Sequence, residues 1–200
     1  MKGVLVRVGV RQALVKARAA LPNAMLLAAA LCLAASCDKM DFPAVGTNAA
    51  PMAAEVYFSP KGGCTAAVVA ELQKAKSEVL VQAYSFTSAA IAKALVDAKK
   101  RGVGIQVILD KSNLTEKYSS ADFVAHADIP TLIDSEHAIA HNKVMVIDGS
   151  VVITGSFNFT KAAEEHNAEN LLVIRDEGLA KKYADNWREH AAHSKPYAGR

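Results

Sequence analysis

Residues 79–109, VLVQAYSFTSAAIAKALVDAKKRGVGIQVIL, decide the fold class. The stretch opens with an apolar run typical of a buried strand, and Thr87 or Ser88 then caps an expected helix. The helix is expected to end at 99–102, where Lys-Lys-Arg places cations in the last turn and Gly follows just beyond. A second apolar run reaches Leu109. Because a crossover of this length joins parallel strands, the stretch predicts a βαβ unit and an α/β fold, with a mixed, largely parallel sheet flanked by helices.

The rest of the chain extends this unit into one domain at residues 54–195. Strands are expected at 55–58, 130–133, 143–147, 151–154 and 170–174, and helices at 65–75, 114–127 and 178–193. Asp148-Gly149-Ser150 is a good signal for a hairpin between two of these strands. No internal repeat is visible.

Charge is distributed unevenly along the 200 residues. The chain has 23 Lys and Arg against 20 Asp and Glu, but residues 1–37 hold five of the basic residues and no acidic one. The remainder is therefore slightly acidic, which argues against a basic nucleic-acid-binding domain, so any phosphate site must be made by local placement of a few charges. Hydrophobic residues make up 52% and charged residues 22%, values that exclude a disordered or fibrous chain.

Residues 1–37 are expected to be a signal peptide. Scattered cations precede an apolar run at 24–36 that ends in small residues before Cys37. This ending resembles a bacterial lipobox, with Cys37 lipidated, but Leu33 is one position early, so ordinary cleavage within 34–36 stays open. An uncleaved helix is less favoured, because the run is short for a spanning segment. The protein is thus expected to be exported and periplasmic, with 38–53 as a flexible linker.

Cysteine usage agrees with a simple extracytoplasmic domain. Cys32 would leave with the signal and Cys37 marks the cleavage site, so Cys64 is the remaining thiol of the domain. Cys64 is expected to be a packed thiol near a helix start rather than a nucleophile.

The segment AHNKVMVIDG at 140–149 carries the strongest chemical signal. His141 and Lys143 are two apart at a strand entrance, so both side chains should point to one face. An imidazole beside an ammonium suits phosphodiester chemistry, because the Lys neutralises phosphate charge while the His attacks phosphorus or moves a proton. The second His-x-Lys pair, His193 and Lys195, is expected to be a solvated tail.

The first pair belongs to a longer pattern. His141-x-Lys143, four intervening residues, Asp148 and then GSFNFT at 155–160 together resemble the HKD motif of the phospholipase D superfamily. The flanking residues AYSFT at 83–87 and KKRGV at 99–103 look very like those of the small, single-motif bacterial Nuc-type endonucleases. The resemblance covers roughly residues 53–190.

The resemblance implies a role for each motif residue. His141 would be nucleophile or general acid, Lys143 would hold the phosphate, and Ser156 and Asn158 would donate hydrogen bonds to its oxygens. Glu169 matches the family carboxylate that orients a histidine. Asp148 completes the motif, although its position in a tight turn suggests that it mainly organises the hairpin.

The family also implies a mechanism through a phosphohistidine, which needs two histidines. A chain with one motif would supply both by forming a twofold homodimer in which His141 meets its own copy. No cofactor is expected, and no cluster of carboxylates, His or Cys has metal-ligand spacing along the sequence. The expected activity is that of a metal-independent endonuclease acting on DNA or RNA. A phospholipase D tethered to a membrane through Cys37 is the alternative, and an inactive exported binding module is a third.

Overall fold

A computed structural model describes residues 53–200 as eight strands and five α-helices, with one short 3-10 helix. The expected signal peptide at 1–37, including Cys37, and the linker up to residue 52 lie outside the described residues. None of the helices within 53–200 combines the length and hydropathy needed to cross a membrane. In chain order, the elements are β1 (Ala53–Ser59), α1 (Cys64–Lys74), β2 (Glu78–Ala83), α2 (Ala89–Lys100), β3 (Gly104–Asp110), η1 (Lys111–Leu114), α3 (Ala121–Ala125), β4 (Thr131–Asp134), β5 (Lys143–Ile147), β6 (Val151–Gly155), α4 (Lys161–Glu165), β7 (Glu169–Arg175), α5 (Glu177–His193) and β8 (Lys195–Tyr197).

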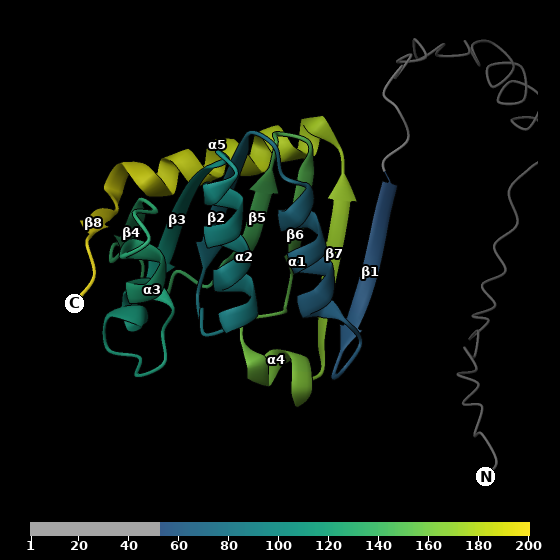
Figure 1. Cartoon of the computed structure of the whole chain (residues 1–200), viewed down its shortest axis with the longest axis horizontal. Helices are drawn as coiled ribbons and strands as arrows, with labels where there is room; N and C mark the ends of the chain where they lie inside the picture. The colour runs from purple at the N-terminus through teal and green to yellow at the C-terminus, as the bar shows by residue number, and fades with distance from the viewer. Residues whose placement is uncertain (1–52) are drawn as a thin grey trace, which may run out of the picture. The chain divides into compact units, whose positions relative to one another are not determined.

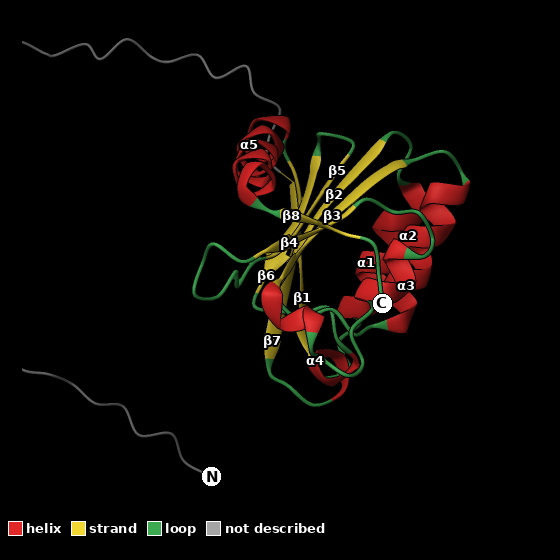
Figure 2. Cartoon of the chain, turned by 90° about the vertical axis from the view of Figure 1, so that its left-hand side faces the viewer, coloured by secondary structure: helices red, strands yellow, loops and turns green. Residues whose placement is uncertain are grey.

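The strands form a single mixed sheet between two layers of helices. Its order is β1-β7-β6-β5-β2-β3-β4-β8. Figure 2 shows α5 on one face of this sheet, with α1, α2 and α3 on the other. The mixed α/β class is confirmed, but the sheet is less parallel than expected, since only β2–β3 and β3–β4 pair in parallel and the other neighbours are antiparallel.

The βαβ unit is built as its sequence predicts. The α2 helix starts after Ser88, whose side chain accepts a hydrogen bond from the Ile91 amide, and Gly102 follows it with a φ of 95°. That left-handed conformation favours glycine because it has no Cβ. Strand β3 then lies parallel to β2 (Figure 1).

A hydrophobic core lies on each face of the sheet. The larger core packs β-strand side chains against α1, α2 and α3, with Phe86, Phe157 and Phe159 fully buried within it. The smaller core lies under α5 and contains Trp187, whose indole nitrogen donates to the Val81 carbonyl at 2.9 Å. Trp187 therefore packs in the core, as its place on the apolar face of the predicted helix implied.

Two segments differ from the sequence-based expectation. Within the helix expected over 114–127, only the five-residue α3 is α-helical; it follows a turn-rich connection from η1, which ends at Leu114. The segment expected as a solvated tail is instead ordered: His193 ends α5, and Lys195–Tyr197 forms β8 on the edge of β4.

Candidate active site

The motif residues gather where four neighbouring strands end or begin. Lys143 at the start of β5 pairs with Ala83 at the end of β2, and Gly155 at the end of β6 pairs with Leu171 near the start of β7. We call this end of the sheet the His141 edge. In Figure 1 it is the end at which α4 lies.

His141 and Lys143 meet around one aromatic ring. The Tyr84 ring lies with its centroid 4.5 Å from that of His141, and the Lys143 Nζ lies 5.2 Å from the centroid of the same ring. Lys143 Nζ also donates to the His141 carbonyl at 2.7 Å. The structure thus brings the two side chains together as their spacing predicted, with the imidazole exposed to solvent.

Lys143 is held in an unusual state for a lysine. Its residue surface is only 6% exposed, and this burial lowers the pKa of the ammonium from its ordinary value, an effect that the nearby Glu169 carboxylate partly opposes. A cation in a site partly shielded from water interacts more strongly with a phosphate oxygen than one in bulk solvent. The geometry therefore suits neutralisation of phosphate charge.

The loop that carries His141 is anchored from the neighbouring strand. The carboxylate of Asp110, buried at the end of β3, accepts a hydrogen bond from the Ala140 amide at 2.7 Å. Lys111 Nζ donates to the His137 carbonyl in the same loop at 2.9 Å. Two contacts from one segment thus hold the approach to His141 in place.

Ser156 and Asn158 lie on the extended connection after β6. Successive side chains of this segment point alternately into the core and away from it. Phe157 and Phe159 between and after them are fully buried, so the two polar side chains face away from the core, as the spacing predicted. The Ser156 hydroxyl accepts hydrogen bonds from the Asn170 amide at 3.0 Å and side chain at 3.4 Å, which leaves its own proton free to donate.

Asn158 has spare hydrogen-bonding capacity. Its buried Oδ1 has no partner among residues 53–200. A buried polar atom left unpaired is costly, and such atoms often mark functional sites. The fold itself therefore does not use this amide oxygen.

Glu169 opens β7 at the same edge. Its carboxylate accepts a hydrogen bond from the Asn167 side chain at 3.1 Å, and it acts electrostatically on Lys143. No hydrogen bond joins it to His141 within the described chain. The structure thus places Glu169 near the ammonium, while its expected orienting of a histidine stays a prediction.

Asp148 is the one motif residue that lies away from the others. It occupies the hairpin turn at the far end of β5, and its carboxylate accepts hydrogen bonds from the amides of Lys76, Ser77 and Glu78 and from the Ser77 hydroxyl. Burial acts to raise the pKa of this carboxyl, but the hydrogen bonds outweigh it and the pKa is lowered. Asp148 therefore ties the hairpin to the start of β2, which is the structural role its turn position suggested.

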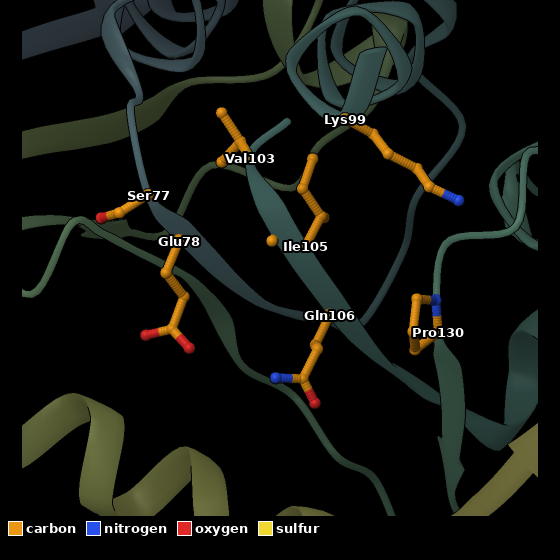
Figure 3. A pocket seen from close by; sticks show the side chains of 8 residues that line it. Ser77, Glu78, Lys99, Val103, Ile105, Gln106 and Pro130 are labelled. Carbon is orange, nitrogen blue, oxygen red and sulfur yellow. The ribbon is translucent and has the colours of Figure 1, made fainter. Parts of the chain in front are cut away.

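A cavity at that far end carries no comparable chemistry. It measures about 400 Å³ and lies beside β2 and β3 (Figure 3). Lys99, on α2, is one of the residues that line this cavity in Figure 3. Lys99 Nζ donates to the carbonyls of Ala127, at 2.9 Å, and Asp128, so its charge is already engaged.

Two further expectations concern Cys64 and metal ligands. Cys64 is fully buried, and burial, with a contribution from Glu164, raises its pKa to about 11, as befits a packed thiol. The expectation that no cluster has metal-ligand spacing is wrong for the folded chain: Asp134, His137, His190 and His193 lie together, with donor atoms within 4.8 Å of one another. We call these four residues the histidine cluster.

Sequence reasoning assigned no role to Tyr84 or Asp110. Tyr84 stood in a stretch already quoted for its family resemblance, and Asp110 directly follows a buried strand. Both positions are where side chains reach the end of a sheet, which is the signal that could have drawn attention to them.

Comparisons with known proteins identify the family of this chain. A model of the family described as "Cardiolipin synthase, PLD-like domain" matches residues 68–191. A Rickettsia typhi protein named "Phospholipase D" is 46% identical over 130 residues, which cover 65% of this chain and 64% of the relative. The chain thus spans just under two thirds of that protein.

Solved structures show the same fold. Nuc from Salmonella typhimurium, described as a phospholipase D family member, superposes with a TM-score of 0.71 at 38% identity, over 74% of this chain and 99% of that one. NucT from Helicobacter pylori gives 0.68 at 22% identity, over 74% of this chain and all of that one, a likeness of fold alone. Because the family model matches residues 68–191, more than half of the chain, the chain belongs to the phospholipase D superfamily.

Proposed function

We propose that the protein is a metal-independent endonuclease that hydrolyses phosphodiester bonds of DNA or RNA. The observation that carries the proposal is the meeting of an exposed imidazole with a buried ammonium on the Tyr84 ring. Ser156, with a free hydroxyl proton, lies at the same edge. These groups are a nucleophile, a fixed positive charge and a hydrogen-bond donor, which together are what attack on a phosphate requires.

The reaction would run in two balanced steps. A neutral His141 nitrogen attacks phosphorus, and the bond from phosphorus to the leaving oxygen breaks while a second, protonated histidine gives that oxygen its proton. Water then attacks the phosphohistidine, the second histidine takes a proton from the water, and the P–N bond breaks. The products are an alcohol and a phosphate monoester, and the enzyme is restored.

The second histidine would be His141 of a second copy of the chain. One copy of the motif supplies one such imidazole, so a twofold dimer is the arrangement that completes the site. The exposed surface supports this, since Ile139, two residues before His141, is 57% exposed. A dimer formed at this edge would cover the Ile139 side chain.

Phospholipase D activity is the second candidate. The Rickettsia typhi relative carries that name. A lipidated Cys37, which stays a prediction of the sequence along with export, would hold such an enzyme near its substrate. The nuclease is preferred because the motif and its flanking residues resemble those of the single-motif Nuc-type endonucleases, and because residues 53–200 include no long apolar loop for lipid.

The deciding experiment compares three substrates under chelation. Full-length protein is incubated with excess EDTA and plasmid DNA, RNA or phosphatidylcholine vesicles, alongside the variants His141→Ala and His126→Ala. We expect nucleic acid to be cleaved, His141→Ala to lose roughly 10⁴-fold or more in kcat, and His126→Ala, an exposed histidine on another face, to match the wild type.

Other outcomes of this experiment would indicate a different mechanism or function. Activity that disappears with EDTA and returns with Mg²⁺ contradicts the proposed mechanism. Choline release without nucleic-acid cleavage identifies a phospholipase D. Turnover of none of the substrates supports an exported binding module.

A further inference from the structure

We propose that the histidine cluster binds one divalent transition-metal ion of the Zn²⁺ class, at a site separate from the His141 chemistry. Its members come from distant parts of the chain. Asp134 ends β4, His137 lies in the loop after it, and His190 and His193 lie one turn apart at the end of α5. The inference is independent of the proposed nuclease activity.

The three imidazoles converge on one carboxylate oxygen. His190 Nδ1, His137 Nδ1 and His193 Nε2 lie 2.8, 3.1 and 3.3 Å from the same Asp134 Oδ2. Ligand atoms at about 2.0–2.1 Å from a tetrahedral Zn²⁺ are roughly 3.3 Å from one another. The contacts to Asp134 already have this spacing, and the widest separation, 4.8 Å, closes with small side-chain rotations.

The distances between the three imidazole rings also fit a shared metal ion. The centroids of the three imidazoles lie 4.8, 5.2 and 5.3 Å apart. Three histidines bound to one tetrahedral ion hold their ring centres roughly 5 Å apart, given Zn–N bonds of about 2.0–2.1 Å. Imidazole nitrogens with one carboxylate oxygen are a donor set that suits Zn²⁺.

The four side chains of the histidine cluster differ in their exposure to solvent. The Asp134 side chain is fully buried, whereas those of His190, His193 and His137 are 14%, 31% and 45% exposed. The Asp134 carboxylate is thus held at the base of the cluster, where a cation entering from the solvent side would meet it.

The ion would cross-link three segments that already meet through hydrogen bonds to Asp134. It would fix the last turn of α5 to the end of β4 and to the loop that carries His141, four residues beyond His137. A metal there would stabilise the fold, and its ligands are distinct from the residues around Tyr84.

Metal binding tests the inference directly. Full-length protein without a polyhistidine tag is stripped with EDTA, dialysed and titrated with Zn²⁺ by calorimetry, and bound metal is counted by mass spectrometry after gel filtration. We expect one Zn²⁺ per chain. His193→Ala and His137→Ala should each weaken binding more than roughly 100-fold, since loss of a group that merely supports a ligand already costs 10–100-fold. Both residues are partly exposed, so both variants should fold.

The control and a second readout make the result decisive. His126→Ala removes an exposed histidine outside the cluster and should bind like the wild type. At about a 100-fold excess over Kd, Zn²⁺ should raise the Tm of the wild type by roughly 5–10 °C and leave that of His193→Ala unchanged. Cobalt should give the visible spectrum of a four-coordinate site. Binding equal in wild type and both cluster variants, or no stoichiometric metal, would mean that the cluster is only a hydrogen-bonded network.

Discussion

Lys143 is 6% exposed at the start of β5, with its ammonium against the Tyr84 ring and the His141 carbonyl. Burying an ammonium costs free energy, which is why the pKa of Lys143 is lowered by burial. The charge is nevertheless what a phosphate oxygen needs. If the proposed function is correct, Lys143 favours catalysis at the expense of stability, a conflict common at active sites.

We expect Lys143→Met to separate these two effects. Removing the charge should lower kcat by roughly 10²–10³-fold, as loss of one preorganised electrostatic group does elsewhere. The variant should melt at the same temperature as the wild type or higher at pH 7, because an apolar chain of similar length replaces a partly desolvated cation. Activity assays and thermal melts of both proteins check this.

The pH dependence of that comparison follows from the lowered pKa. Between the pKa of folded Lys143 and its ordinary value of 10.5, the unfolded chain binds the proton more tightly, so wild-type stability rises with pH in this window. The advantage of Lys143→Met should thus be fully present below the folded pKa and vanish by about pH 10.5. A variant that melts well below the wild type at pH 7 would show that the ammonium stabilises the fold.

Individual site residues were predictable where they share a local pattern. His141 with Lys143, and Ser156 with Asn158, have the two-residue spacing that places side chains on one face of an extended segment. The histidine cluster was not predictable in this way, because Asp134 and His190 are brought together only by the packing of α5 on the sheet. The spacing of His190 and His193, three residues apart at a helix end, was the local sign of it.

At the scale of elements, the β5–β6 hairpin is held by one carboxylate. Asp148 has a φ of 53° and accepts hydrogen bonds from backbone amides at the start of β2. The turn therefore closes the hairpin and fixes it to the neighbouring strand at once. The Lys143 end of β5 is positioned indirectly, through a strand whose other end is tied down.

We expect Asp148→Asn to destabilise the fold while leaving chemistry nearly intact. Asn tolerates the left-handed conformation, so the change removes mainly the charge from these hydrogen bonds, at a cost of about 1–2 kcal/mol for a partly exposed group. Tm should fall by roughly 2–8 °C, with kcat per folded molecule within a few-fold of wild type.

The sign of the pH effect provides an internal check. Because the folded pKa of Asp148 is lowered, its contribution is fully present above the ordinary value of 3.8 and is lost as the pH falls through the folded pKa. The gap in Tm between Asp148→Asn and wild type should close in the same range. A large loss of kcat with unchanged Tm would instead assign Asp148 to the catalytic step.

Elements with strong local signals were predictable, and elements that depend on tertiary contact were not. The α2 helix has a cap, a cationic end and Gly102. Residues 114–127 lack such signals, and their start is shaped by tertiary hydrogen bonds, from the Asn113 side chain to the Tyr84 carbonyl and from the Ser120 amide to the Phe86 carbonyl. Strand β8 forms by pairing with the edge strand β4. A three-residue segment has no sequence pattern that predicts such pairing.

At the scale of the whole molecule, the described chain presents one His141 edge, and the two-step reaction needs two imidazoles. In the proposed dimer, Phe58, 63% exposed on β1, and Ile139, 57% exposed two residues before His141, would supply apolar surface for contact with a second copy. In an isologous dimer the same surface of both copies forms the contact, so the twofold axis would bring the two His141 side chains together.

We expect His141→Ala chains to inactivate wild-type chains by mixing. After exchange of subunits at a fourfold excess of the variant, about one fifth of wild-type chains keep a wild-type partner, so activity per wild-type chain should fall to about one fifth. His141 is exposed, so its replacement should leave the contact surface folded. The same excess of His126→Ala chains should raise total activity about fivefold and leave activity per chain unchanged, because those chains still carry His141. Sedimentation should find a dimer at assay concentrations. Wild-type activity that is indifferent to excess His141→Ala, together with an active monomer, would place both proton transfers within one chain and rule out the shared site.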